Sequence, residues 1–100
     1  MDLFIKFKFL LSPILAQMRM SEICEKLHPE AFGSGYSIFQ NNSTKIRIIW
    51  DGKDSWGYIQ FWNENSWEDI PIYLTKLELE NEKVINEKVN KMFVTIEEIS

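Results

Sequence analysis

The sequence predicts an α+β domain in which two helices pack on one face of a largely antiparallel sheet of about five to six strands. The main observation is the segment 45–62, where two runs of alternating side chains flank the turn pair Asp51-Gly52. Other short alternating runs and two segments with helix-capping residues support the same class. With 100 residues and 45% hydrophobic content, the chain suits one domain, residues 1–100, with one core.

The central hairpin distributes its large side chains over two faces, because successive side chains of a strand alternate. In the first strand, the two faces hold Ile46, Ile48 and Trp50 on one side and Lys45, Arg47 and Ile49 on the other. In the second strand, the two faces hold Trp56, Tyr58, Gln60 and Trp62 on one side and Gly57, Ile59 and Phe61 on the other. Since both faces carry apolar groups, we expect both to be covered at least in part.

The N-terminal part predicts a strand followed by a helix. Apolar residues alternate over 3–11, which indicates a first strand with one apolar face. Ser12-Pro13 has the residue types of a helix N-cap and first turn, so we expect a helix over 13–28. Its apolar side is discontinuous, which suggests a break near Ser21, and Pro29 ends it.

The middle of the chain predicts a loop over 30–35 and a short strand over 36–40, followed by a turn at 41–43 into the central hairpin. A polar loop over 63–66 comes after the hairpin. Residues 70–80 alternate like a strand, and Pro71, which lacks a backbone donor, places its start at an edge or irregularity.

Asn81 is a suitable N-cap for a helix over 82–92. Residues 94–99 alternate like a last strand but also fit a helical continuation. The expected order is therefore strand, helix, four strands, helix and strand.

Few residues could perform catalysis. Cys24 and His28 are four apart and would be neighbours on a helix, where a thiolate–imidazole pair or two metal ligands can be drawn. Either chemistry needs a third group that the sequence does not supply, and a buried Cys24 with His28 at a helix C-terminus explains both residues more simply. Gly33-Ser34-Gly35 lacks the lysine of a phosphate-binding loop. We therefore expect no enzyme activity, catalytic residue, cofactor or metal.

The charge is unevenly distributed. The chain has a net charge of −4. Residues 1–50 hold 6 basic and 4 acidic side chains, whereas residues 51–100 hold 5 basic and 11 acidic ones. An acidic half disfavours nucleic acid and favours a basic partner, although it is also typical of an ordinary solvated surface.

Aromatic side chains are concentrated after residue 50. Four tryptophans lie within 18 residues, and the set is Trp50, Trp56, Tyr58, Trp62, Trp67 and Tyr73. Several of them are expected in the core. The others could anchor a protein interface, or form a strip of Trp56, Tyr58 and Trp62 that binds a small ligand or carbohydrate.

The turn at 41–44 and the loop at 63–69 are predicted to lie at one end of the sheet, because each is one strand away from the Asp51 turn at the other end. They bring together the candidate partner-binding residues Asn41, Asn42, Asn63, Glu64, Asn65, Trp67, Glu68 and Asp69.

The expected compartment is the cytoplasm, because Cys24 is the single cysteine and cannot form an intramolecular disulfide. The apolar N-terminal segment carries Asp2, Lys6, Lys8 and Pro13, which do not fit a secretory signal, and it is too short to cross a bilayer.

In its small size, acidity, tryptophan content and lack of catalytic residues, the chain resembles the immunity proteins that neutralise bacterial contact-dependent toxins. The segment 27–33 (LHPEAFG) and the Trp50-Asp51-Gly52 turn are similar in character to that class. The resemblance implies a non-enzymatic protein that binds a basic, nuclease-type toxin domain in a 1:1 complex, with neither nucleic acid nor membrane as its partner.

Overall fold

A computed structural model describes residues 2–99 as an α+β domain with two helices and a five-stranded antiparallel sheet, which confirms the predicted class. The elements, in chain order, are α1 (Leu3–Gln17), β1 (Ser21–His28), β2 (Ser34–Gln40), β3 (Lys45–Asp51), β4 (Trp56–Asn63), β5 (Ser66–Thr75), the 3-10 turn η1 (Glu78–Glu80) and α2 (Glu82–Ile99). The strands are neighbours in sequence order, β1-β2-β3-β4-β5.

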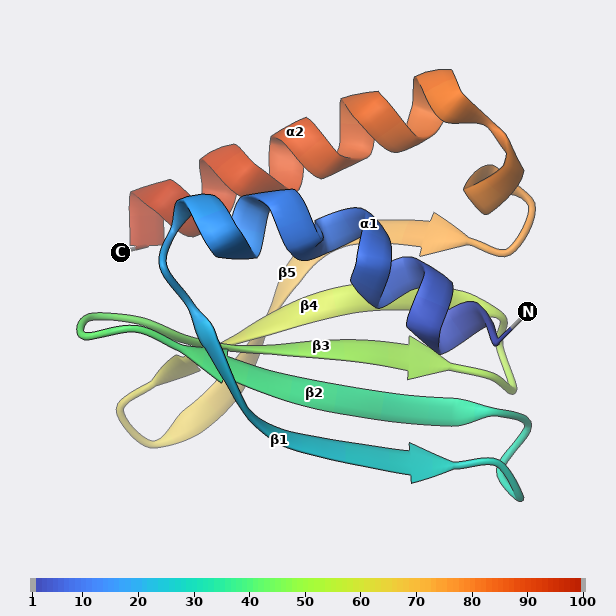
Figure 1. Cartoon of the computed structure of the whole chain (residues 1–100), viewed down its shortest axis with the longest axis horizontal. Helices are drawn as coiled ribbons and strands as arrows, with labels where there is room; N and C mark the ends of the chain where they lie inside the picture. The colour runs from blue at the N-terminus through green and yellow to red at the C-terminus, as the bar shows by residue number, and fades with distance from the viewer. Residues whose placement is uncertain (1, 100) are drawn as a thin grey trace.

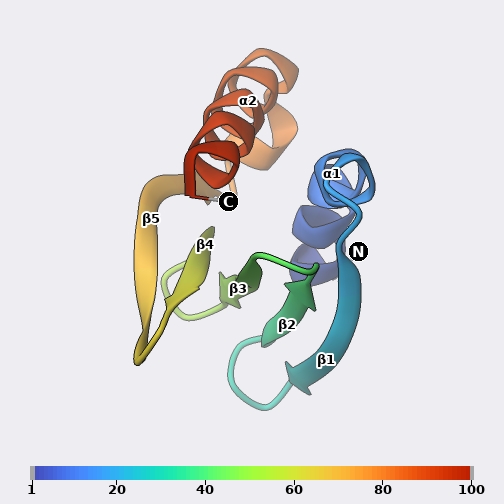
Figure 2. The same cartoon turned by 90° about the vertical axis from the view of Figure 1, so that its left-hand side faces the viewer.

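Both helices lie on the same face of the sheet (Figure 1). Viewed from the end, the edge strands β1 and β5 rise toward the helix layer, so the sheet curves around the helices (Figure 2). The other face carries no helix and is the outer side of this curve. It is called the open face below.

The core lies between the sheet and the helices. The strands supply Ile48, Trp50 and Ile59, which are all at most 1% exposed. From α1, Phe7 packs against Trp50 with ring centroids 6.0 Å apart. The grouping of side chains into two faces that was predicted for both hairpin strands is confirmed by the alternating burial of β3 and β4. The helices cover only one face, whereas most open-face side chains of β3 and β4 are half-buried by their neighbours on the sheet.

The turn between β3 and β4 is where the sequence predicts it. Asp51 Oδ1 accepts bonds from the backbone N–H groups of Lys53 and Asp54, at 3.0 and 3.2 Å. A Cβ atom on Gly52 would lie 1.9 Å from the Phe32 carbonyl oxygen, so only glycine fits.

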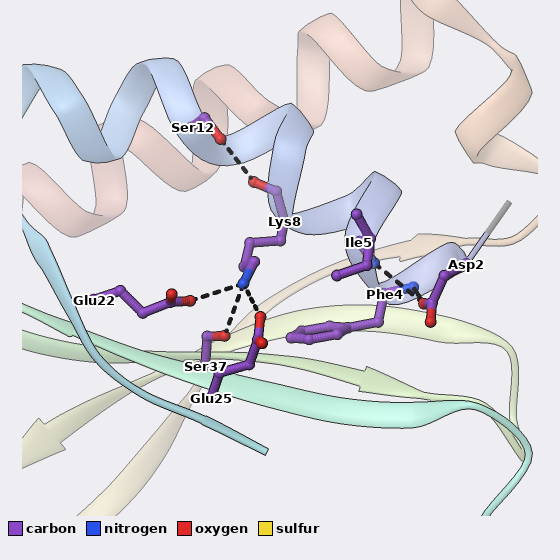
Figure 3. A network of polar contacts seen from close by, with 8 residues as sticks. All are labelled: Asp2, Phe4, Ile5, Lys8, Ser12, Glu22, Glu25 and Ser37. Atoms are coloured by element: carbon purple, nitrogen blue, oxygen red, sulfur yellow. Dashed lines mark hydrogen bonds and ion pairs between the residues drawn. The ribbon is translucent and has the colours of Figure 1, made fainter. Parts of the chain in front are cut away.

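The prediction of a strand over 3–11, with a helix starting at Ser12-Pro13, is wrong because α1 covers Leu3–Gln17. The Asp2 side chain caps it by accepting bonds from the N–H groups of Phe4 and Ile5, at 2.9 and 3.3 Å (Figure 3). The buried side of α1 has helical spacing and comprises Phe4, Phe7, Leu11, Ile14 and Leu15. Because most residues of this segment are apolar, its pattern fits both the two-residue period of a strand and the 3.6-residue period of a helix. Packing of its apolar side against the sheet favours the helix.

The predicted helix over 13–28 ends instead at Gln17, and Ser21–His28 is the edge strand β1. Arg19 turns the chain with a left-handed backbone, φ 56°. The segment contains good helix formers at Glu22, Glu25, Lys26 and Leu27. It nevertheless completes a sheet whose β2 edge would otherwise be unpaired, so tertiary context prevails.

A polar network joins α1 to β1 (Figure 3). Lys8 forms ion pairs with Glu22, at 2.7 Å, and with Glu25. Lys8 also donates to Ser37 Oγ, at 3.3 Å. Burial alone would lower the pKa of Lys8, but its bonds to Glu22 and Glu25 outweigh it and raise the pKa above 10.5. These ion pairs hold β1 against the helix layer. β1 is an edge strand, so it has a neighbouring strand on one side only.

The C-terminal part differs from expectation in its boundaries. The last strand is Ser66–Thr75 rather than 70–80, and it is irregular opposite Tyr58 and Ile59, next to Pro71. Residues 94–99 continue α2, so of the two alternatives the helical one is right. Glu78 of η1 pairs with Lys88 of α2 at 2.7 Å, and Lys88 donates to the Tyr73 carbonyl at 2.7 Å. Neither helix within residues 2–99 is long and apolar enough to cross a membrane.

Candidate binding surface

The register of the sheet arranges the open-face side chains in four rows that cross the strands. The first row contains His28, Ser34, Asp51, Trp56 and Thr75. The second contains Lys26, Tyr36, Ile49, Tyr58 and Tyr73. The third contains Cys24, Ile38, Arg47, Gln60 and Asp69. The fourth contains Gln40, Lys45, Trp62 and Trp67. Aromatic rows therefore lie on either side of a polar one.

The aromatic side chains of the open face form two groups. Tyr73 contacts Trp56 and Tyr58, with ring centroids 5.4 and 5.6 Å apart. Trp62 and Trp67 form an edge-to-face pair at 5.3 Å. Trp56 and Trp62 remain 37% and 40% exposed, whereas Trp50, on the other face, is 1% exposed. One tryptophan thus belongs to the core, and the rest of the set lines an uncovered surface.

The polar row between these groups is a hydrogen-bonded chain. Arg47 donates from Nε and Nη2 to Gln60 Oε1, the first bond being 2.9 Å long. Gln60 donates in turn to Asp69 Oδ1 at 2.7 Å. The Arg47 guanidinium lies 4.5 Å from the Trp67 ring and 5.5 Å from the Tyr36 ring. Two aromatic rings and an amide therefore hold one cation in the middle of the face.

Tyr58 is the open-face residue whose pKa is shifted. Burial raises the pKa of the Tyr58 hydroxyl, and the negative charges of Asp69 and Asp51 raise it further. Tyr58 is thus an uncharged phenol at neutral pH. It offers a neutral donor and acceptor to a binding partner.

The two turns at 41–44 and 63–66 lie at the same end of the sheet, as predicted. Gln40 pairs with Lys45, and the neighbouring Ile46 pairs with Phe61 close to the second turn. This end is called the tip. It carries the predicted partner-binding residues, but it does not bring all of them to one face.

Alternation divides the acidic residues of the tip between the faces. Trp67 and Asp69 point to the open face, while Glu68 lies between them and opposite Phe61, on the other side. Glu68 accepts a bond from Asn63 Nδ2 at 3.1 Å. Glu64 forms the turn with a left-handed backbone, φ 52°, and with Asn65 it is exposed at the extreme end.

Asn41 has a structural role in the first turn. Its Oδ1 accepts bonds from the N–H groups of Ser43 and Thr44, at 2.9 and 2.8 Å, and its Nδ2 donates to the Met18 carbonyl at 2.9 Å. Asn42 is exposed beside it. A hollow of about 460 Å³ lies between this turn and β1, lined by Met18, Arg19, Ser21, Ile23 and Gln40 with residues 41–43.

The helical neighbour relation expected for Cys24 and His28 is wrong. Both lie on β1, where four residues span about 13 Å, so the thiol and the imidazole do not meet. His28 instead faces Glu30 at 3.6 Å and lines a hollow of about 270 Å³ with Tyr36, Asp51 and Tyr58. Among residues 2–99, no group of three His, Cys, Asp or Glu side chains could hold a metal ion.

The central role of Arg47 was not expected from the sequence. Its alternation placed it on the same face as Lys45 and Ile49, but the contacts with Tyr36 and Trp67 depend on strands β2 and β5, whose order alternation does not give. A signal was nevertheless present, since Arg47, Gln60 and Asp69 are polar residues at positions that a covered face would fill with apolar ones.

Comparisons of this chain with protein-family models, with curated proteins and with solved structures found no match.

Proposed function

We propose that the chain is a non-enzymatic, cytoplasmic binding protein of the immunity type, which binds a basic, nuclease-type toxin domain through the tip and the adjoining open face. The observation that carries the proposal is a sheet face left uncovered by the helices and lined by aromatic rings around an arginine. Tryptophan, tyrosine and arginine are the side chains that most often anchor protein interfaces.

The shape of this face supports a protein partner. It is the outer side of a curved sheet, and an outward-curving surface complements the concave active site of an enzyme better than it encloses a small molecule (Figure 2). Blocking such a site is how an immunity protein would neutralise a nuclease.

The charge of the tip supports a basic partner. Glu64, Glu68 and Asp69 lie within six residues at this end, where Lys45 lies over the Trp62 ring. Carboxylates at the border of an interface accelerate association with a positively charged protein and weaken binding to a negatively charged one.

A second candidate is a small-ligand or carbohydrate-binding module, which the exposure of Trp56 and Trp62 favours. These two rings are six residues apart on β4, or about 20 Å, and the Arg47–Gln60–Asp69 row separates them. One sugar ring could stack on Trp56 or on Trp62, but not on both. This arrangement supports a broad protein contact more than a continuous sugar-binding strip.

The test begins with the reading frame next to the gene. If it encodes a large secreted protein, its C-terminal toxin domain is purified and its affinity for this protein is measured by calorimetry. We expect a 1:1 complex and protection of cells that produce the toxin domain. The triple variant Glu64→Lys, Glu68→Lys and Asp69→Lys should bind at least about tenfold more weakly.

The matched control is Glu87→Lys, Glu97→Lys and Glu98→Lys on α2, which changes the net charge by the same amount at three other exposed sites. It should retain affinity close to wild type. Equal losses in both variants would show that only total charge matters and would refute the tip as the contact surface. Failure of the wild-type protein to bind the toxin domain, together with binding of a soluble oligosaccharide that Trp62→Ala removes, would support the second candidate.

A further inference from the structure

Arg47 occupies the centre of the open face and differs from Lys8 and Lys88, the two lysines that are tied into the fold by ion pairs, in how its charge is partnered. Lys8 and Lys88 have carboxylate partners in the fold. Arg47 has none among the described residues, because its bonds go to the neutral amide of Gln60. Asp69 accepts a hydrogen bond from Gln60 rather than from Arg47, so Gln60 lies between the two charged groups.

Within residues 2–99, the hydrogen bonds of the guanidinium leave one of its edges without a partner. Gln60 Oε1 accepts from Nε and Nη2, which form the lateral edge of the group. A guanidinium carries five N–H donors in one plane, so the terminal edge formed by Nη1 and Nη2 keeps two parallel donors. This pair has the spacing of the two oxygens of a carboxylate and binds them bidentately.

The surroundings prepare this edge for a ligand. The Trp67 and Tyr36 rings, 4.5 and 5.5 Å away, restrict the side chain, so little conformational entropy is lost on binding. Gln60 is itself oriented by Asp69 at 2.7 Å. A partner that covers the face would also exclude water from the bond, which strengthens a charge-assisted contact.

We propose that Arg47 is the specificity-determining residue of the open face and binds the carboxylate of an aspartate or glutamate side chain of the partner protein. This inference rests on the proposed function. The acidic tip attracts a positively charged domain, and the central arginine donates to the one carboxylate that the partner places at the matching position. A basic domain without that carboxylate would leave Arg47 covered and unpaired, which disfavours it as a partner.

A phosphodiester could also use two parallel donors, but the charges around Arg47 favour a single carboxylate. Lys26 and Lys45 share the open face with Asp51 and Asp69, so the basic groups do not form an uninterrupted track along which a nucleic-acid backbone could run. Nucleic acid is therefore an alternative that the experiment must distinguish.

The experiment compares Arg47→Gln and Arg47→Lys with the control Lys83→Gln, which removes the same charge from an exposed position on α2, in binding to the toxin domain of the neighbouring reading frame. Arg47→Gln should bind at least about tenfold more weakly. Arg47→Lys keeps the charge but not the paired donors and should be intermediate. Lys83→Gln should remain within about twofold of wild type. Unchanged thermal unfolding will show that each variant is folded.

A second measurement needs no toxin domain. Sodium acetate is titrated into the protein at constant ionic strength, set with sodium chloride, while the side-chain nitrogen resonances of its two arginines are followed by NMR. The Arg47 resonances should shift with acetate in a saturable manner, and those of Arg19 should not. An equal response of the two arginines, or no response, would overturn the proposal.

The remaining outcomes separate the two proposals. If the wild-type protein binds the toxin domain and Arg47→Gln binds equally well, the role of Arg47 is refuted while the proposed function stands. If the wild-type protein does not bind, the proposed function fails and the acetate titration alone decides on Arg47. Binding of a 15-nucleotide oligothymidine that is lost in Arg47→Gln would overturn the carboxylate assignment in favour of nucleic acid.

Discussion

Single side chains determine how closely α1 approaches the sheet. Gly57 lies on the helix-facing side of β4, under the ring of Phe7. A Cβ atom at this position would lie 2.6 Å from Phe7 Cδ2, well inside van der Waals contact. The Phe7 ring is fully buried against Trp50 and has little room to move. The lack of a Cβ atom at Gly57 therefore allows α1 to lie this close to the sheet.

We expect Gly57→Ala to destabilise the protein by about 1–3 kcal/mol, because the added methyl group overpacks the core. Chemical denaturation will measure the change. The double variant Phe7→Leu and Gly57→Ala should lose less than the sum of the two single variants, because leucine leaves room for the methyl group. Additive losses would show that the two residues do not compete for the same space.

At the scale of elements, polar side chains tie together segments that apolar contacts alone would leave loosely joined. Lys8 connects α1 to the edge strand β1. Glu78 and Lys88 connect η1 to α2, and Lys88 also bonds to the backbone of β5. Each link joins a helix to one edge of the sheet, where half of the strand's hydrogen-bonding groups have no strand partner.

The Glu78 link should make stability depend on pH. Its bond from Lys88, followed by that from the backbone N–H of Thr75, holds the pKa of the Glu78 carboxyl below 4.5. Because the folded-state pKa is lowered, the contribution is complete above the unfolded-state value and is lost as pH falls through the folded-state value.

We therefore expect Glu78→Gln to lower the free energy of unfolding by about 1 kcal/mol at pH 7, with the difference from wild type vanishing at acidic pH. Urea denaturation at several pH values will measure it. Glu80→Gln, an exposed neighbour in the same turn, serves as the control and should have little effect at any pH. A difference that persists below the folded-state pKa would contradict the role of the charge.

At the scale of the molecule, burial is greater in the middle of the sheet than at its β1 edge. β3 has a strand on each side and helices above it, whereas β1 has one neighbour and is exposed along most of its length. Amide exchange measured by mass spectrometry should therefore be slowest in β3 and fastest, among the strands, in β1. Equal protection in β1 and β3 would show that the sheet opens only as a unit.

The open face is also a property of the whole molecule. Alternation alone assigns Tyr58, Gln60 and Trp62 to the face opposite Ile59, and this assignment is correct. The helices cover only the face that carries Ile59. This placement depends on the two connections that lead from α1 into β1 and from β5 into α2. The same alternation correctly brings the two turns to one tip, but it also separates Glu68 from Asp69, which the grouping by sequence position had placed together.

The sequence by itself determined the central hairpin, its Asp51-Gly52 turn, the two faces of β3 and β4, and the start of α2, because turn chemistry, period-two alternation and capping act between residues close in the chain. Only the tertiary structure decided that residues 3–17 are helical and 21–28 extended, since a nearly continuous apolar segment fits either period until it packs on a sheet. It also decided that Arg47 lies between Tyr36 and Trp67, because strands distant in sequence must be neighbours for the three side chains to meet.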